Sequence, residues 1–261
     1  MIAMKYIRYK DSKENISIGI IREGKIYKID YKSISDANKD MALNNNLNVL
    51  YVEDEDNISF LEPTIPTKVI CVGLNYKDHA EELNMPLPEE PLLFMKSSTA
   101  TIAHKDEIVY PKISQQVDYE GELGIVVLED INYNEFNDDV QLAYTIVNDV
   151  TARDLQKKDG QWTRAKNFDT FCPIGPCVVT DINPSNLNIE LKVNGQLKQN
   201  SNTSNMIFSP MELVKYISSI MTLKRGDVIA TGTPPGVGQL HKGDTVSITI
   251  EKIGTLENTI K

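Results

Sequence analysis

The sequence has few of the residues that build compact metal and redox sites. Its 261 residues contain three histidines and three cysteines, and the cysteines are Cys71, Cys172 and Cys177. The histidines, at positions 79, 104 and 241, lie too far apart for a short zinc motif such as HExxH, and the cysteine spacing fits neither CxxC nor a zinc pattern. We therefore expect reduced, buried thiols, and we expect any metal site to consist of carboxylates, which favour hard cations such as Mg²⁺, Mn²⁺ or Ca²⁺.

Long apolar runs and an excess of basic residues are also missing. No stretch approaches the roughly 20 apolar residues of a membrane helix, and the start, MIAMKYIRYK, carries charge where a signal peptide has its apolar segment. The net charge of −10 repels phosphate backbones. We expect a cytoplasmic protein without membrane or nucleic-acid partners. Small anionic substrates stay compatible, because one bound cation reverses the local field.

The first sixty residues predict a small N-terminal β-rich domain. Short strands are expected over 4–9, 16–21 and 25–29, and a polar stretch at 35–48 is a helix or a loop. The segment EPTIP at 62–66 predicts an extended linker, because prolines hold the chain and the residue before them extended. We place the boundary near residue 64, which gives domains 1–64 and 65–261.

The remaining chain is rich in expected strands, over 68–72, 92–95, 117–128, 142–150, 177–180, 187–193, 227–230 and 245–250. Asn194 and Gly195 predict a type I′ hairpin turn. The best helices are expected over 151–158 and 210–221, with one or two helical turns over 75–83. This pattern predicts an α+β fold dominated by β-structure.

A first candidate site lies in the segment DYEGELGIV at 118–126. Residues two apart in a strand point to one face, so Asp118, Glu120 and Glu122 are expected to share a face. Carboxylates crowded at the end of a buried strand repel one another and lose hydration, and a bound divalent cation removes both costs. A solvated strand face is the alternative from this segment alone.

A second candidate site follows an apolar strand that ends at Asp149. Thr151 is placed to cap the next helix, with Asp154 three residues later. Arg153 and Gln156 fall on one face of the first turns, which brings a carboxylate, a forked donor and an amide together. The alternative is that Asp149 only caps the helix and that Arg153 pairs with Asp154.

Three further segments carry polar residues in informative patterns. In GLNYKDHAEE at 73–82, a helical turn brings His79 within hydrogen-bond reach of Glu82, and a carboxylate-oriented imidazole is a general base near neutral pH. An exposed surface helix is the alternative. WTRAKNFDTFCPIGP at 162–176 interleaves cations with aromatics. TGTPPGVG at 231–238 lacks the ending of a Walker loop, and it is either an anion-binding loop or a plain tight loop.

Together these segments resemble the fumarylacetoacetate hydrolase family, in its short bacterial, acylpyruvase-like branch. GLNYKDHAEE, DYEGELGIV, NDVTARDLQ, WTRAKNFDTFCPIGP, NGQLKQ and TGTPPGVG occur in the family's order, and the resemblance covers about residues 66–255. It implies a mixed β-sheet roll of the fumarylacetoacetate hydrolase C-terminal type, which forms a homodimer.

The resemblance also implies roles for individual residues. By this resemblance, the metal ligands are Glu120, Glu122 and Asp149. They are expected to hold one Mg²⁺ or Mn²⁺ ion per subunit. The implied catalytic residues are His79, Glu82 and Lys166, and the implied substrate-binding residues are Arg153, Gln156, Thr233 and Lys96. Some larger members add an Asp where this chain has Cys-Val-Gly at 71–73, so water or substrate is expected to complete the coordination.

The implied substrate is a small 2-oxo acid or dicarboxylate. Cleavage of an acylpyruvate leaves a pyruvate enolate, whose charge the metal and Lys166 stabilise, while His79 takes a proton from the attacking water. We predict this C–C hydrolysis. Oxaloacetate decarboxylation and isomerisation of 2-hydroxyhepta-2,4-diene-1,7-dioate pass through the same kind of enolate and are the alternatives. A non-catalytic metal-binding module is a further alternative.

Overall fold

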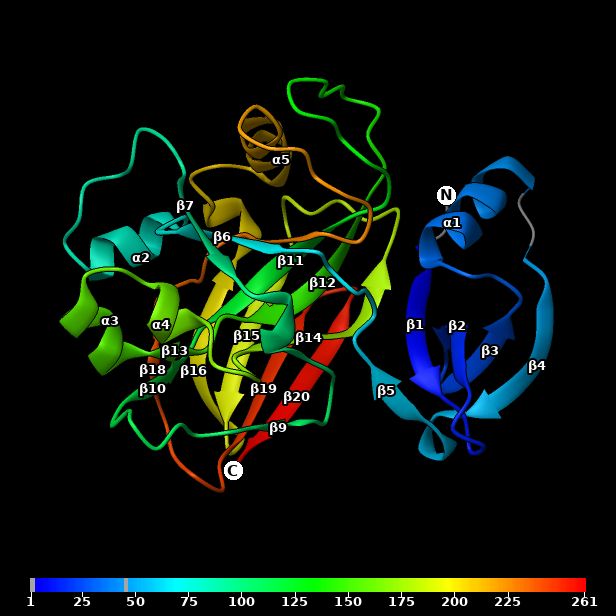
Figure 1. The fold of residues 1–261 in the computed structure, drawn as a ribbon, viewed down its shortest axis with the longest axis horizontal. Helices are drawn as coiled ribbons and strands as arrows, with labels where there is room; N and C mark the ends of the chain where they lie inside the picture. The colour runs from blue at the N-terminus through cyan, green and yellow to red at the C-terminus, as the bar shows by residue number, and fades with distance from the viewer. Residues whose placement is uncertain (1–2, 45–46) are drawn as a thin grey trace.

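The computed structural model describes residues 3–44 and 47–261, and strands dominate them (Figure 1). One large mixed sheet has the strand order β4 (Val49–Asp54), β3 (Lys25–Ile29), β2 (Ile16–Arg22), β1 (Lys5–Lys10), β14 (Cys172–Val179), β12 (Leu142–Asn148), β11 (Gly121–Val127), β17 (Val228–Ala230), β6 (Val69–Gly73) and β7 (Leu92–Lys96). Two short strands extend it, β5 (Ser59–Leu61) beside β1 and β8 (Thr101–Ile102) beside β14.

Two smaller sheets and five helices complete the described secondary structure apart from short 3₁₀ turns. The five-stranded sheet has the order β16 (Gln196–Asn202), β15 (Asn188–Val193), β19 (Thr245–Ile250), β20 (Gly254–Ile260) and β9 (Glu107–Ile108). The three-stranded sheet consists of β13 (Thr151–Ala152), β10 (Val117–Tyr119) and β18 (Gly238–Leu240). The helices are α1 (Ile34–Asn44), α2 (Lys77–Glu82), α3 (Arg153–Asp159), α4 (Thr163–Lys166) and α5 (Pro210–Ser218). The predicted α+β class, a mixed and β-dominated roll, is confirmed.

The N-terminal strands form one end of the large sheet, at the right of Figure 1. Strands β1 to β4 are antiparallel neighbours. Helix α1 covers most of the polar stretch left as helix or loop, of which residues 45 and 46 lie outside the described residues. β1 also pairs with β14, through Lys5 with Val179 and Tyr6 with Val178. The large sheet thus continues from the N-terminal strands into the rest of the chain through the pairing of β1 with β14. The division into 1–64 and 65–261 stays a prediction.

The centre of the large sheet is buried on both faces. Every residue of β11 is buried, because β12 and β17 flank it and the hydrophobic core lies against it on both sides. A strand covered on both faces has a continuous apolar sequence, here GIVV. In β19, by contrast, only Val246, Ile248 and Ile250 point inward, and this alternation matches a sheet with one solvated face.

The local turn and helix predictions have mixed outcomes. The hairpin between β15 and β16 is confirmed, because Asn194 and Gly195 both have positive φ, 51° and 77°, as a type I′ turn requires. The prediction that Thr151 caps a helix is wrong. Thr151 and Ala152 pair with β10 as a short strand, and α3 begins only at Arg153 without a side-chain cap. The last predicted helix, α5, ends at Ser218 instead of residue 221.

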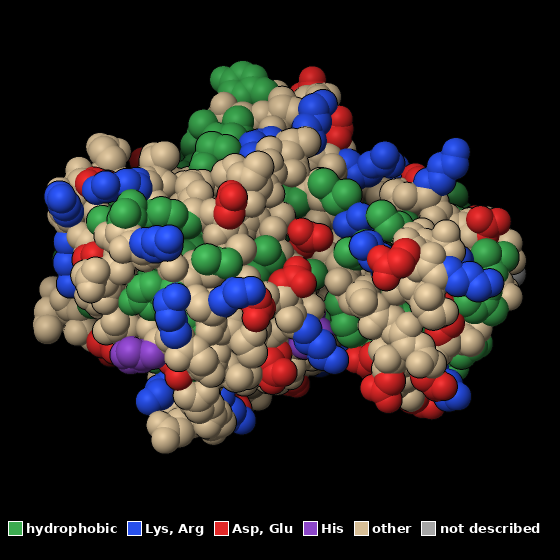
Figure 2. Space-filling view, turned by 60° about the horizontal axis from the view of Figure 1, so that its bottom comes forward, with side chains coloured by type: hydrophobic (Ala, Val, Ile, Leu, Met, Phe, Trp, Pro, Cys, Tyr) green, Lys and Arg blue, Asp and Glu red, His purple; other side chains and the backbone are tan. Residues whose placement is uncertain are grey.

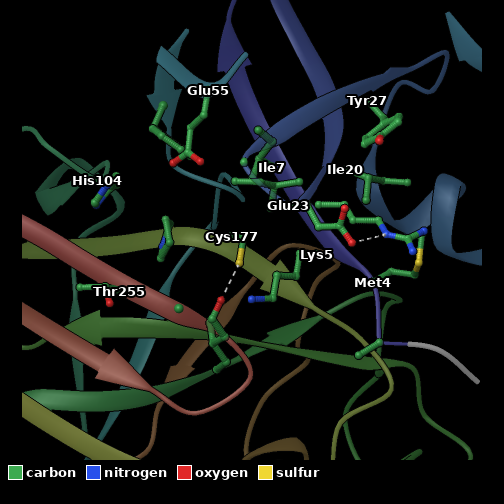
Figure 3. Close-up of a pocket in the computed structure, with 18 of the residues that line it drawn as sticks. Met4, Lys5, Ile7, Ile20, Glu23, Tyr27, Glu55, His104, Cys177 and Thr255 are labelled. Atoms are coloured by element: carbon green, nitrogen blue, oxygen red, sulfur yellow. Dashed lines mark hydrogen bonds and ion pairs between the residues drawn. The ribbon is translucent and has the colours of Figure 1, made fainter. Parts of the chain in front are cut away.

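A cavity of about 960 Å³ lies between the N-terminal strands and the core (Figure 3). Ile7 and Ile20 line it from the N-terminal side, and Cys177, Ile253 and His104 line it from the core side. We call it the junction cavity. None of the residues predicted to act in catalysis or metal binding lines it. The three cysteines are free and buried, as expected.

The surface and the helices add two observations. On the face shown in Figure 2, basic side chains are interspersed with acidic ones. That face therefore has no extended basic track of the kind that follows a nucleic-acid backbone. Among the helices of the described chain, none combines the length and the apolar character needed to cross a membrane.

Candidate active site

The three predicted carboxylate ligands meet at one end of the large sheet. β11 and β12 are antiparallel neighbours with Gly121 opposite Asn148, so the start of one strand meets the end of the other. Glu120 and Glu122 flank Gly121, and Asp149 follows Asn148. Each carboxylate places an oxygen within 4.8 Å of the other two, and all three side chains are buried. We call these three residues the carboxylate cluster.

The strand predicted over 117–128 is interrupted at Glu120. Residues 117–119 form β10 in the three-stranded sheet, and residues 121–127 form β11 in the large sheet. Across this interruption, Asp118 and Glu120 still share Arg153 as a hydrogen-bond donor. Asp118 lies outside the carboxylate cluster and accepts a hydrogen bond of 2.8 Å from Nε of Arg153.

Two carboxylates of the cluster that lie only two residues apart have opposite pKa shifts. Burial alone raises the pKa of a carboxyl group. At Glu120, Lys166 and Arg153 outweigh burial and lower the pKa to about 2. At Glu122, burial and then the charges of Asp149 and Glu120 hold the pKa well above its ordinary value. A positive charge beside Glu122 would relieve both the burial cost and the repulsion.

Two buried lysines contact the carboxylate cluster. Lys166 Nζ donates to Glu120 Oε2 at 2.9 Å and to Asp149 Oδ2 at 2.5 Å. Lys96 Nζ donates to Asp149 Oδ1 at 2.5 Å and to the carbonyl of Val150 at 2.9 Å. Burial alone lowers the pKa of a lysine, but Asp149 and Glu120 raise the pKa of Lys166 above its ordinary value. Lys166 therefore stays positively charged inside the site.

Arg153 joins the carboxylate cluster to its surroundings. Its Nη2 donates to Glu120, its Nε to Asp118, and its Nη1 to Gln156 Oε1 at 2.7 Å. The structure thus brings Arg153 and Gln156 together as predicted, on the first turn of α3. The alternative in which Arg153 pairs with Asp154 is not observed, since the carboxylate of Asp154 accepts instead from the hydroxyl of Ser114 and the N–H of Gln115.

The predicted His–Glu pair is formed on α2. His79 Nδ1 lies 2.8 Å from Glu82 Oε2, and the side chains are 12% and 43% exposed. The second carboxylate oxygen, Oε1, accepts a hydrogen bond of 3.1 Å from the N–H of Gly236. The pair is therefore attached to the loop at 231–238, which also contacts the carboxylate cluster. We call His79 and Glu82 the dyad.

The loop at 231–238 contacts Glu122 through its backbone and contacts Gly121, which lies between Glu120 and Glu122, through Thr233. The N–H of Gly232 donates to Glu122 Oε2 at 2.8 Å. Thr233 Oγ1 donates to the carbonyl of Gly121 at 3.0 Å and accepts from Gln199 Nε2 at 2.9 Å. A hydroxyl has one proton, so this side chain can donate to a substrate carboxylate only by exchanging its bond to Gly121.

The donors present fit a hard divalent cation. Oxygen ligands lie about 2.0–2.6 Å from Mg²⁺ or Ca²⁺, hence at most about 5 Å from one another, and the oxygens of the cluster are within 4.8 Å. The hydroxyl of Tyr76 and Nδ2 of Asn148 are buried and have no hydrogen-bond partner in the described part of the chain. Asn148 directly precedes Asp149 of the carboxylate cluster. Orphaned buried polar atoms are expected where a ligand or ordered water completes a site.

Residues that act through other residues are the ones that sequence reasoning missed. Asp118 appeared only as a possible member of the acidic face, and its contact with Arg153 was not foreseen. Gln199 appeared only as the last letter of the motif NGQLKQ. Its hydrogen-bond partners lie 78, 34 and 35 positions away in the sequence, so no local spacing could indicate them.

The chain was compared with protein-family models, with known proteins and with solved structures, and matching structures cover nearly all of it. Residues 68–261 match the family model described as Fumarylacetoacetate (FAA) hydrolase C-terminal. A protein of Archaeoglobus fulgidus is 63% identical over 77% of this chain and 82% of its own, and the mitochondrial oxaloacetate tautomerase FAHD2B of Bos taurus is 44% identical over 78% of this chain and 69% of its own. The crystal structure of a 2-hydroxyhepta-2,4-diene-1,7-dioate isomerase from Mycobacterium marinum is 38% identical, with a TM-score of 0.85 over 98% of each chain.

Proposed function

The chain belongs to the fumarylacetoacetate hydrolase family, and from this premise we propose that it is a divalent-metal-dependent enzyme that interconverts keto and enol forms of a small 2-oxo dicarboxylate. The observation that carries the proposal is the buried carboxylate cluster in contact with two buried lysines. Two relatives are named for isomerisations of this kind, an oxaloacetate tautomerase and an isomerase of a 2-hydroxydienoate, which is itself an enol. Oxaloacetate is therefore the first substrate to test.

The charges of the site favour an anionic substrate once a cation is bound. A Mg²⁺ or Mn²⁺ ion held by the carboxylate cluster would polarise the 2-oxo group and stabilise the enolate charge. The cluster and Asp118 supply four carboxylates, and the cations beside them are Arg153, Lys96 and Lys166. The protein's own charges thus leave one negative charge when all four carboxylates are ionised, which a divalent ion would reverse.

Lys166 supplies a fixed positive charge where the enolate develops. Its ammonium is held by hydrogen bonds to Glu120 and Asp149, and these carboxylates raise its pKa. A charge that is already oriented needs no rearrangement when the substrate becomes an enolate. A protonated lysine cannot act as the base, so Lys166 stabilises charge and another residue moves the proton.

His79 is the residue that moves the proton in this proposal. Its partner Glu82 holds the imidazole by Nδ1, which leaves Nε2 to exchange a proton with the substrate. His79 takes the proton from the carbon next to the 2-oxo group and delivers it to the enolate oxygen, which gives the enol. In the reverse reaction it takes the proton from the enol hydroxyl and returns it to carbon. The other histidines lie elsewhere: His104 lines the junction cavity, and the side chain of His241 is 72% exposed.

Hydrolysis of an acylpyruvate is the second candidate, and the dyad is the observation that favours it. A carboxylate-oriented imidazole can activate water as readily as it can accept a proton from carbon. The same carboxylates and Lys166 would stabilise the pyruvate enolate that leaves when the C–C bond breaks. Oxaloacetate decarboxylation needs neither attacking water nor a base, so it depends on Lys166 and the cation alone.

We further propose a homodimer as the working assembly, with a small 2-oxo acid or dicarboxylate as the substrate and neither nucleic acid nor membrane as a partner. The family resemblance and the net charge of −10 support these proposals. Light scattering coupled to gel filtration measures the mass in solution. A monomeric mass would contradict the assembly without affecting the proposed chemistry.

The test of function compares three readouts on one substrate panel, with Mg²⁺, with Mn²⁺ and with EDTA. Enol absorbance reports tautomerisation of oxaloacetate, pyruvate release reports hydrolysis of acetylpyruvate or fumarylpyruvate, and carbon dioxide release reports decarboxylation. We expect metal-dependent loss of the oxaloacetate enol to be the fastest reaction. Metal-dependent cleavage of acylpyruvates at a higher rate would transfer the assignment to hydrolysis. Metal binding without any turnover would point to the non-catalytic module.

A further inference from the structure

The buried carboxamide of Gln199, on β16, joins two segments of the site that are far apart in sequence. The side chain is 1% exposed. Its Oε1 accepts a hydrogen bond of 2.9 Å from the N–H of Gly121. Its Nε2 donates to Thr233 Oγ1 at 2.9 Å and to the carbonyl of Pro234 at 2.7 Å. Gln199 thus connects the start of β11 with the loop at 231–238.

The first of these segments carries two ligands. Gly121 lies between Glu120 and Glu122, and both polar atoms of its backbone are held, the N–H by Gln199 and the carbonyl by Thr233. A side chain at position 121 would crowd this arrangement, because a Cβ there would lie 3.2 Å from Gln199 Oε1. The hydrogen bonds of Gln199 therefore fix the backbone from which the two glutamates project.

The second segment carries the attachment point of the dyad. Two residues beyond Pro234, the N–H of Gly236 donates to Glu82, which holds His79. Gly236 has a φ of +93°, and a Cβ there would lie 2.2 Å from the carbonyl oxygen of Lys198. Only glycine therefore allows the loop to rest directly on β16 beside Gln199.

The same strand also holds the start of α2. Ser201 lies two residues beyond Gln199, and its hydroxyl donates to Asp78 Oδ2 at 2.6 Å. Asp78 directly precedes His79 and also accepts from the amide of Asn205 at 3.2 Å. β16 therefore contacts α2 through Ser201 and contacts the loop that holds α2 through Gln199.

We propose that Gln199 is a positioning residue that sets the dyad relative to the carboxylate cluster, through the loop at 231–238. Gln199 itself touches neither a ligand side chain nor the dyad; it fixes the backbone on both sides. A residue that only fills space in this core would affect stability alone, whereas a positioning residue also affects the rate. The turnover part of this proposal rests on the proposed function, and the structural part does not.

Two substitutions separate the halves of the carboxamide. Gln199→Met keeps the length and removes every hydrogen bond. Gln199→Glu keeps an oxygen for Gly121 but loses the donors to Thr233 and Pro234. The matched control is Asn258→Leu, because Asn258 is equally buried, lies in the same five-stranded sheet, and donates only to the carbonyls of residues 103 and 106.

The expected result combines three readouts. Both Gln199 variants should lower kcat at least about tenfold, since misplacement by about 1 Å can cost about 10²-fold. The Kd for Mn²⁺ should stay within about threefold in Gln199→Glu, which keeps the oxygen that holds Gly121. Hydrogen exchange should become faster in the peptides that cover 77–83 as well as in those that cover 231–236. Asn258→Leu should speed exchange near residues 103–108 and leave kcat unchanged.

Three outcomes would overturn the proposal. One is an unchanged kcat in both Gln199 variants, and another is faster exchange at 231–236 with α2 unaffected, which would confine Gln199 to local support. A loss of Mn²⁺ affinity in Gln199→Glu as large as its loss of kcat would place the effect on the ligands instead of the dyad. If the wild-type protein turns over none of the panel, the proposed function fails, and the exchange and Mn²⁺ readouts still decide the positioning role.

Discussion

Burial acts on ionisable groups both at the carboxylate cluster and at His104, which lines the junction cavity, but with different effects on charge. At the cluster, opposite charges are held in contact, and Glu120 and Lys166 both stay ionised. At the cavity, burial and then Lys105 lower the pKa of His104 to about 4, so the imidazole is neutral and its Nδ1 accepts from the N–H of Glu257 at 3.0 Å. Charge is retained at the cluster, where chemistry is proposed, whereas the His104 imidazole beside the cavity loses its charge. Substitutions in the two regions should therefore have different consequences.

The largest effect is expected from Glu122→Gln in the carboxylate cluster. Loss of a ligand should lower metal-dependent turnover more than about 10³-fold, because the bound cation contributes several kcal/mol of charge stabilisation. The melting temperature should hold or rise, because the substitution removes the repulsion of Glu122 by Asp149 and Glu120. Calorimetric Mn²⁺ titration, the enol assay and thermal melting measure the three quantities. Undiminished Mn²⁺ binding would show that the cluster is not the metal site.

Lys166→Met should lower turnover by about 10²–10³-fold, the usual cost of removing one donor that stabilises a developing oxyanion. Metal affinity should not fall, because Glu120 and Asp149 lose a competing cation. The matched control is Lys68→Met, since Lys68 pairs with the buried Asp227 outside the cluster. It should lower the melting temperature and keep kcat. Equal kinetic losses in both variants would remove the distinction between the two kinds of ion pair.

His79→Ala should separate the candidate reactions. Keto–enol interconversion and acylpyruvate hydrolysis should both fall about 10²-fold, since each needs a proton transfer. Oxaloacetate decarboxylation should survive in part, because carbon dioxide leaves without a base. The three assays of the substrate panel measure the split, and His241→Ala serves as the exposed control. Full tautomerase activity in His79→Ala would assign the proton transfer to another residue.

At the junction cavity, Ile7→Val should change stability without changing chemistry. Ile7 is fully buried and lines the cavity, so losing one methylene should cost about 0.5–1.5 kcal/mol in the free energy of unfolding. Turnover should stay within about twofold of the wild type. Urea denaturation and the enol assay check the two parts. A kinetic defect larger than the stability loss would show that the N-terminal strands act on the site.

The smallest effect is expected from His104 and depends on pH. Its pKa is about 4 in the folded protein against an ordinary value of 6.5, so the unfolded chain binds more protons between these values. The contribution of His104 to stability is therefore complete above about pH 6.5 and is lost as the pH falls toward 4. His104→Gln should flatten this part of the melting-temperature profile, and His241→Gln should not. Parallel profiles in all three proteins would refute the assignment.

Local sequence patterns predicted the elements whose neighbours lie close in the chain. β3 and β19 have the bounds expected from alternation, the Asn194–Gly195 hairpin was readable from its turn, and the dyad was readable from helical spacing. β20 went unassigned for a physical reason. Its inward positions are Leu256, Asn258 and Ile260, so a buried polar residue interrupts the apolar alternation.

The parts of the site that could not be predicted depend on long-range pairing. Alternation along 117–128 cannot report that the chain changes sheets at Glu120. The short strand β13 exists only because β10 pairs with it from more than thirty positions away, and this pairing displaced the expected Thr151 cap. The family motifs indicated the three carboxylates that the structure brings together, but they did not indicate which buried residues hold the motifs together.

The change of sheet at Glu120 also has a consequence for the size of the metal ion that the proposed site prefers. Glu120 lies between two sheets, whereas Glu122 and Asp149 lie at the paired ends of two strands in one sheet. Two hydrogen bonds hold Glu120, the joint between β10 and β11, against the end of β12. They run from the N–H of Glu120 to Asn148 Oδ1 at 3.1 Å and from the N–H of Asp149 to the carbonyl of Glu120 at 2.9 Å. Mg²⁺ demands short and regular coordination, while larger ions accept longer and more variable distances. The stiffness of this joint, more than the identity of the ligands, should therefore set the size of ion that the protein prefers.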